Sequence, residues 1–158
     1  MTPFTRLALA AAFTVLSFGT AMAGNDLSPA DSKAMHDYAL SMDKVKAMGA
    51  AMDDFQALGK TDPAFKNAKP VGNDSKSLAE MESRIAANPK MMGVLKKHGL
   101  SAHDMAIMPF VLMYAGMCVE YPSAAPKLAQ QTSPAQIAFY RQHRNEMKAM
   151  KWLNGSSG

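Results

Sequence analysis

Methionine sulfur is the most abundant group in this sequence that could bind a ligand. The chain has 15 methionines, one cysteine and four histidines in 158 residues. Thioether sulfur is a soft ligand that suits Cu(I). Met113 and Met117 are four residues apart, a spacing that brings side chains together on a helix, and Cys118 follows them. These three residues are the first candidate metal ligands, and Met48 and Met52, which have the same spacing, are the second.

A simpler interpretation explains the same residues without a metal. Met is a flexible core filler, and an unpaired Cys is commonly buried as a small hydrophobic residue. The Met pairs all lie on stripes of apolar residues that a helix would turn inward. We therefore expect no cofactor and keep Cu(I) binding as the alternative.

A haem site is a third interpretation. Helical bundles bind b-type haem through axial ligands such as Met and His on different helices. Met35 lies early in the first expected helix, and His143 lies midway along the last one. These two residues are the candidate ligands for haem b. The sequence has no C-x-x-C-H motif for covalent attachment.

Motifs typical of enzymes are missing. The sequence has no G-x-S-x-G, H-E-x-x-H, C-x-x-C or glycine-rich phosphate loop. His98, His103 and Asp104 lie close together around Gly99, which first suggests a metal site. Their positions also suit helix ends, with His98 in a last turn and Asp104 as the capping partner of Ser101. We therefore predict a protein that is not an enzyme and has no catalytic residues.

The first 23 residues have the pattern of a secretory signal peptide. Arg6 supplies a positive charge, Leu7 to Phe18 form an apolar stretch, and Ala21-Met22-Ala23 is a cleavage signal before Gly24. The apolar stretch is shorter than the roughly 20 residues that span a bilayer. We therefore expect cleavage after Ala23 and a periplasmic or secreted protein. The formal charge of +4 is only mildly basic and does not resemble the clustered Lys and Arg of a nucleic-acid-binding surface, so we expect no nucleic-acid partner.

The remaining chain predicts a single helical domain at residues 24–153, followed by a disordered tail at 154–158. Met and Ala favour helices, and residues that favour strands are sparse. Proline and capping residues mark the starts of helices at Ser28, Asn88, Ser101 and Ser133. The expected fold is an all-α bundle of about four main helices plus a short one.

Helix boundaries follow from these signals. We expect a long first helix from Ser28 to Leu58, a basic loop at 59–73, and a second helix that opens at Asp74 or Ser75. A short helix then precedes Gly99, and the last long helix follows Ser133. The helix after Ser101 is apolar on all sides, so it is expected to be the buried centre of the bundle. Because Pro109 interrupts its apolar run, we expect no transmembrane span.

Part of the chain resembles a known group of proteins. The segment from Asn88 to Met150 has an A-N-P helix start, a G-L-S turn followed by Asp104, an apolar helix and a late Q-I-A-F helix. This pattern resembles small, signal-peptide-bearing proteobacterial helical proteins of unknown function. The resemblance implies a secreted helical domain and no assigned activity, and no functional residues carry over from it.

The function that these patterns favour is a non-enzymatic binding or interaction module. Gly49 on the apolar seam and a kink at Pro109 would leave a gap, so we expect an apolar groove there. The expected partner is a protein, a peptide or a small apolar ligand, with a homo-oligomer as a further option. Cu(I) binding and haem b binding remain the second and third interpretations.

Overall fold

The structure is a computed structural model that describes residues 27–66 and 75–153. The predicted signal peptide at 1–23, the tail at 154–158, residues 67–73 of the predicted basic loop and Asp74 lie outside the described residues. The described residues form eight α-helices, two 3-10 helices and no strand. The predicted all-α class is therefore confirmed.

The helices of the described residues follow in this order along the chain. The N-terminal ones are α1 (Pro29–Asp37), α2 (Met42–Thr61), α3 (Pro63–Lys66), α4 (Leu78–Ala86) and α5 (Pro89–Lys97). They are followed by α6 (Ala102–Glu120), the 3-10 helix η1 (Pro122–Leu128), α7 (Pro134–Gln142), α8 (Arg144–Ala149) and the 3-10 helix η2 (Lys151–Leu153).

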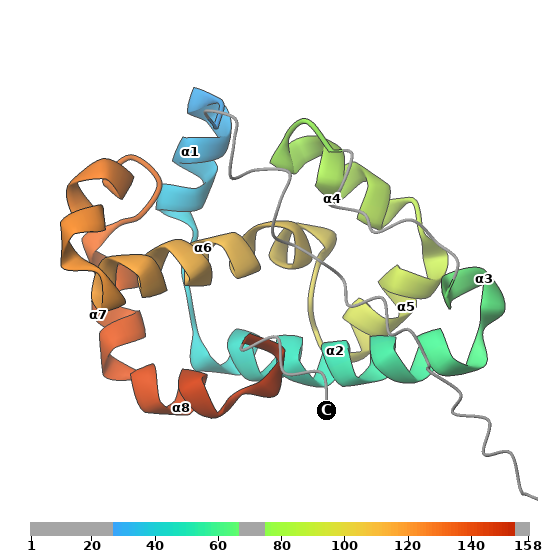
Figure 1. Ribbon diagram of the computed structural model, residues 1–158. Coiled ribbons are helices and arrows are strands. Elements are labelled where there is room, and N and C mark those ends of the chain that lie inside the picture. The colour runs from blue at the N-terminus through green and yellow to red at the C-terminus, as the bar shows by residue number, and fades with distance from the viewer. Residues whose placement is uncertain (1–26, 67–74, 154–158) are drawn as a thin grey trace, which may run out of the picture.

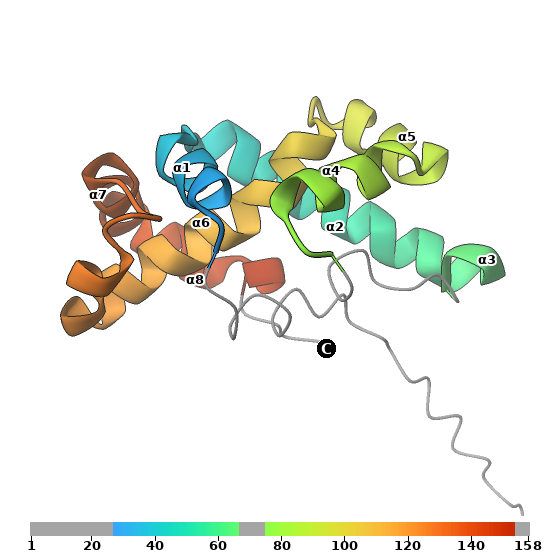
Figure 2. The same ribbon diagram turned by 90° about the horizontal axis from the view of Figure 1, so that it is seen from above.

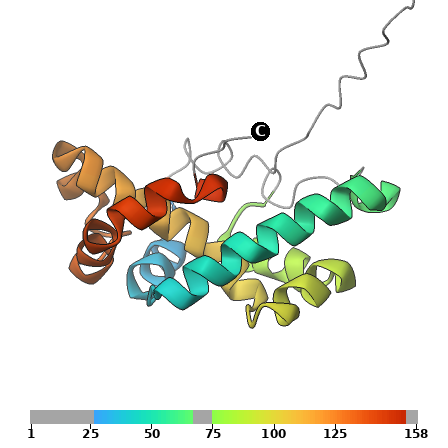
Figure 3. The same cartoon turned by 90° about the horizontal axis from the view of Figure 1, so that it is seen from below.

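Helix α6 lies at the centre of the molecule. It runs across the middle of Figure 1, with α1 and α4 on one side and α2 and α8 on the other. Figure 2 shows α7 at the C-terminal end of α6, away from α3 and α5. In the view from below in Figure 3, α2 and the red C-terminal segment both pass in front of α6. Twelve of the 19 residues of α6 are buried, so the predicted apolar core helix is present.

The first turn of α6 is set by local sequence. The Ser101 hydroxyl accepts a hydrogen bond from the Asp104 amide at 3.0 Å, and the Asp104 carboxylate accepts one from the Ser101 amide at 3.0 Å. This is the capping box that the sequence predicts. The helix continues through Pro109 for 19 residues. It is long and apolar enough to cross a membrane by length and composition, and 67% of that stretch is buried inside the fold.

The predicted long first helix is wrong, because the chain leaves helical geometry after Asp37. Residues 38–41 connect α1 to α2, and the side chain of Ser41 caps the start of α2. A residue far along the chain binds to this break. The Gln136 side-chain amide donates hydrogen bonds to the carbonyl oxygens of Met35 at 2.7 Å and Tyr38 at 2.8 Å. A side chain about 100 residues away thus adds hydrogen bonds to carbonyls at the C-terminal end of α1, where the Tyr38 amide also donates to Met35 at 3.3 Å.

The predicted last helix is also interrupted. His143, with φ −102° and ψ 15°, ends α7, and α8 begins at Arg144. The change of direction buries Met147 and brings Trp152 onto α2. Because both long helices are broken, the structure does not match the predicted count of about four main helices plus a short one.

Two further helix boundaries lie a few residues later in the chain than predicted. Helix α2 continues through Gly59 to Thr61, so this glycine does not end it. Helix α4 begins at Leu78, with Ser77 as its cap, which is later than the predicted start at Asp74 or Ser75. The Asp31 carboxylate of α1 accepts a hydrogen bond from the Leu78 amide at 3.1 Å, so α1 fixes where α4 begins.

Aromatic side chains occupy the space at two helical glycines. A Cβ atom on Gly49 would lie 3.0 Å from the Trp152 ring, and one on Gly116 would lie 3.0 Å from the Tyr140 ring. The predicted groove beside Gly49 is therefore wrong, because the indole ring of Trp152 fills it. These two contacts attach the C-terminal helices to α2 and α6.

Candidate functional site

Three large apolar side chains are exposed on the C-terminal half of α6. Met113 is 44% exposed, Met117 is 38% exposed and Tyr121, which ends the helix, is 66% exposed. Their spacing of four residues places them along one strip of the helix surface. They are the exposed large hydrophobic residues of the part of the chain that the structure describes. We call Met113, Met117 and Tyr121 the α6 ridge.

The ridge exists because the two halves of α6 are covered differently. Every residue from Asp104 to Met108 is buried, with α1, α4 and α5 packed around this part of the molecule. The C-terminal half packs against α7 and η1, where Tyr140 lies on Gly116. Helix packing there leaves the strip through Met113 and Met117 without cover.

Charged groups border the ridge. Glu120 follows Met117 by three residues, which places both on the same side of α6. The Glu120 carboxylate accepts a hydrogen bond from Arg144 Nε at 2.7 Å and a second one from the same guanidinium group, and Lys148 Nζ lies 3.4 Å away. The Arg144 guanidinium lowers the pKa of Glu120, and the carboxylate raises the pKa of Arg144 in turn. Helix α8 thus carries two cations beside the apolar strip.

Cys118 does not share this surface. It is 4% exposed, while its neighbour Met117 faces solvent. Burial raises the pKa of the Cys118 thiol, and the adjacent Thr132 hydroxyl opposes this only in part. The structure therefore places Met113 and Met117 on one strip of the surface. The side chain of Cys118, the third predicted metal ligand, is buried in the interior.

The other methionine candidates lie in the core. Met48 and Met52 of α2 are both buried in the main apolar cluster, and Met35 is fully buried in the same cluster. His143 Nδ1 lies 2.9 Å from Glu146, and its ring packs on Phe139 with the centroids 4.8 Å apart. No observation joins Met35 and His143 in one site, and the haem interpretation stays a prediction.

The histidines and Asp104 near Gly99 do not form a metal cluster. His98 Nε2 lies 2.8 Å from Asp54, and His103 Nδ1 lies 2.9 Å from Glu82. Among the described residues, no group of three His, Cys, Asp or Glu side chains could hold a metal ion. This agrees with the interpretation of Asp104 as a capping residue.

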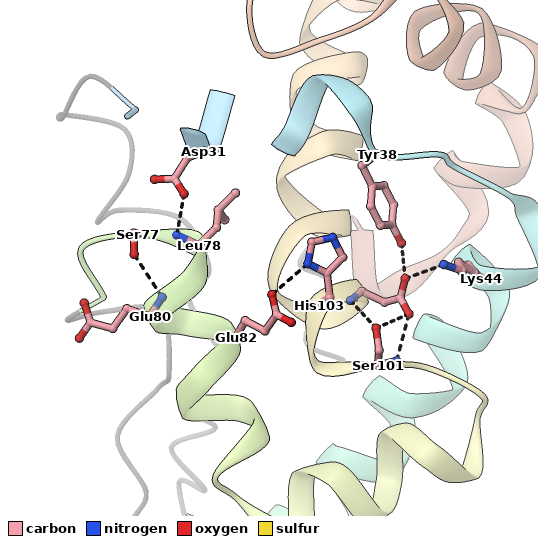
Figure 4. Close-up of polar contacts among 10 residues, drawn as sticks. Asp31, Tyr38, Lys44, Ser77, Leu78, Glu80, Glu82, Ser101 and His103 are labelled. Carbon is pink, nitrogen blue, oxygen red and sulfur yellow. Dashed lines mark hydrogen bonds and ion pairs between the residues drawn. The ribbon is translucent and has the colours of Figure 1, made fainter. Parts of the chain in front are cut away.

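Asp104 has a second role that the sequence does not reveal. Its Oδ1 accepts hydrogen bonds from Tyr38 Oη and Lys44 Nζ, each at 2.7 Å, while the Ser101 hydroxyl donates to Oδ2 at 2.7 Å. Figure 4 shows Tyr38, Lys44 and Ser101 converging on this point. Tyr38 and Lys44 are 66 and 60 residues away in the chain, so no local pattern could have identified them.

The electrostatics of this cluster follow from its geometry. Burial alone would raise the pKa of Asp104, but the hydrogen bonds from Lys44, Ser101 and Tyr38 outweigh it and hold the pKa well below its usual value. Burial and the adjacent carboxylate raise the pKa of Tyr38. Because the carboxylate oxygens already accept these bonds, the cluster holds α1, α2 and α6 together and is poorly placed to move protons.

Comparisons with protein-family models, with curated proteins and with solved structures find no significant match to this chain. The chain's own surface is therefore the basis for its proposed function.

Proposed function

We propose that this protein is a non-enzymatic binding module that uses the α6 ridge as its contact surface. The signal peptide predicted at residues 1–23 would direct it to the periplasm or outside the cell. The observation that carries the proposal is the clustering of Met113, Met117 and Tyr121, the exposed large apolar residues of the described chain, on one strip of a helix. Contiguous exposed apolar surface is typical of interaction sites.

The composition of the ridge suits a reversible contact. Met side chains are unbranched and polarizable, so they adapt to partners of different shape. Tyr121 adds a rigid ring with a polar end, a residue type that is common in interfaces. The Asp104 cluster lies at the other end of α6, which keeps the helix fixed while the ridge is engaged.

A photo-crosslinking experiment tests this proposal. Benzoylphenylalanine replaces Met117 on the ridge, and the same amino acid replaces Ala79, which is exposed on α4, in the control. Irradiation of cells of the source organism should give specific adducts from position 117 and few from position 79. Equal labelling at the two positions would show that the ridge is not a preferred contact surface.

The second candidate function is Cu(I) binding. The observation in its favour is that the thioethers of Met113 and Met117 are both exposed and one helical turn apart. Two soft ligands on an accessible helix face can receive Cu(I) without any rearrangement of the core. The core pair Met48 and Met52 would require the fold to open.

A Met→Leu series separates the two functions, because Leu keeps the apolar surface and removes the sulfur. The Met113→Leu/Met117→Leu variant should lose Cu(I) in competition with a calibrated chelator, while the core control Met48→Leu/Met52→Leu should retain it. If the ridge variant holds Cu(I) as well as the original protein, the metal function is excluded. The apolar contact should survive Met→Leu and disappear in Met113→Gln/Met117→Gln.

A further inference from the structure

The α6 ridge is too small to form a stable protein interface by itself. With about 200 Å² for each large side chain, exposed fractions of 44, 38 and 66% amount to roughly 300 Å². A standard protein interface buries about 800 Å² on each partner, with complementary surfaces around its core. A bilayer surface needs no complementary shape, so a few protruding apolar side chains are sufficient to dock on it.

The positive charge of the chain lies in the same part of the sequence as the ridge. Residues 105–158 contain five Lys or Arg residues and two Asp or Glu residues, a net charge of +3. Residues 7–104 contain eleven of each and are neutral. The surplus belongs to η1, α7, α8 and η2, and η1 and α7 pack against α6.

Several of these cations are near the ridge. Arg144 and Lys148 both reach Glu120, which lies on the ridge side of α6. Lys127 is exposed on η1, the element that follows Tyr121. Arg141 is exposed and follows Tyr140, the residue that packs on Gly116 beside Met117. Arg144 and Lys148 are therefore balanced by Glu120 and Glu146, and the positive charge on the elements next to the ridge comes from Lys127 and Arg141.

This charge distribution argues against a second copy of the chain as the occupant. In a two-fold dimer through the ridge, the same surface would face itself. The cationic elements of both copies would then be brought together, and like charges repel. A partner with negative charge next to apolar material is complementary to this surface.

We propose that the α6 ridge docks on the surface of an anionic phospholipid bilayer. Met113, Met117 and Tyr121 would insert at the boundary between headgroups and acyl chains, where Tyr is favoured. Lys127 of η1 and Arg141 of α7 would contact the lipid phosphates. This inference rests on the proposed function, since it names the partner of the same surface.

Vesicle sedimentation tests the apolar part of the proposal. The full chain is mixed with phosphatidylcholine vesicles that contain 30% phosphatidylglycerol, and with vesicles of phosphatidylcholine alone. Met113→Gln/Met117→Gln should lower the partition coefficient on the anionic vesicles about tenfold. The control Ala50→Gln/Ala79→Gln changes two exposed alanines on α2 and α4 and should bind like the original protein. All variants carry the same N-terminal segment, so its own affinity for lipid is common to every comparison between variants on the same vesicles.

A charge series tests the electrostatic part. Lys127→Gln/Arg141→Gln should weaken binding to the anionic vesicles about fivefold for each cation removed. The control Lys76→Gln/Lys96→Gln removes the same charge from α5 and the segment before α4 and should bind almost as well as the original protein. High salt should weaken binding of the original protein.

The outcomes separate this inference from the proposed function. Equal binding of the original protein to the two vesicle types, or no loss in the ridge variant, would overturn the membrane proposal. If position 117 still crosslinks to a protein in that case, the binding module stands and its partner is a protein. If position 117 crosslinks no more than position 79, the proposed function fails.

Discussion

The two halves of α6 have similar apolar sequences and opposite surroundings. In the N-terminal half, Met105 and Met108 are buried, and Asp104 joins this end of the helix to α1 and α2. In the C-terminal half, Met113 and Met117 face solvent. The difference shows that apolar composition alone does not separate a core residue from a contact residue, because neighbouring helices decide which side is covered.

The strongest test of this contrast is one truncation made in each half. Met108→Ala should destabilise the protein by about 2–5 kcal/mol, because it removes a fully buried side chain and leaves a cavity. Met113→Ala should cost clearly less, about 1 kcal/mol, because 44% of that residue is already exposed. Urea unfolding of both variants measures this. Similar losses would mean that the ridge is buried in solution.

The second test removes the charge that fixes the N-terminal half. Asp104→Asn should cost about 2 kcal/mol near neutral pH, because it weakens the hydrogen bonds from Lys44, Tyr38 and Ser101. Lys44 is partly exposed and can regain water, which limits the loss. Thermal unfolding of the two proteins measures the difference, and Tyr38→Phe, which removes one of these bonds, should lose less.

The contribution of Asp104 to the free energy of unfolding should decrease as the pH falls. Hydrogen bonds hold the pKa of folded Asp104 below its unfolded value of about 4. Its contribution to stability is therefore complete above that pH and is lost as the pH falls further. The stability gap between the original protein and Asp104→Asn should shrink below about pH 4. A gap that stays constant down to pH 2 would contradict the role of the ionised carboxylate.

The smallest effect concerns adjacent residues in the C-terminal half. Cys118 is buried and its pKa is raised, so it should react slowly with a thiol reagent at pH 8. A cysteine at the neighbouring exposed position, in Met117→Cys/Cys118→Ala, should react at least about tenfold faster. The measurement is the rate of reaction with a chromogenic disulfide. Equal rates would indicate that this end of α6 opens readily.

The parts of the fold that depend on neighbouring residues could be predicted from the sequence. Ser101 with Asp104 and Ser133 with Gln136 form the expected capping boxes, because each bond joins residues three apart. Pro89 after Asn88 marks the start of α5 for the same reason. The all-α class follows from many such local signals in agreement.

The parts that were not predicted depend on contacts between distant residues. Gln136 donates hydrogen bonds to carbonyls at the break after Asp37, and the Asp104 cluster includes Tyr38 and Lys44. The α6 ridge could not be predicted from the sequence either, for another reason. A helix that is apolar on every side has no periodicity to show which face its neighbours leave open, so Met113 and Met117 could be paired from the sequence but not placed at the surface.

The hydrogen bonds of Gln136 have a consequence for the order of folding. A ribosome delivers the chain from its N-terminus, and Gln136 emerges about 100 residues after the α1 carbonyls that it binds. Tyr140 and Trp152, which pack on Gly116 and Gly49, emerge later still. Until then, α1 lacks its C-terminal partner and the faces of α2 and α6 at these glycines stay open. Completion of the native structure therefore waits until Trp152 has emerged, and a growing chain remains accessible to chaperones until then.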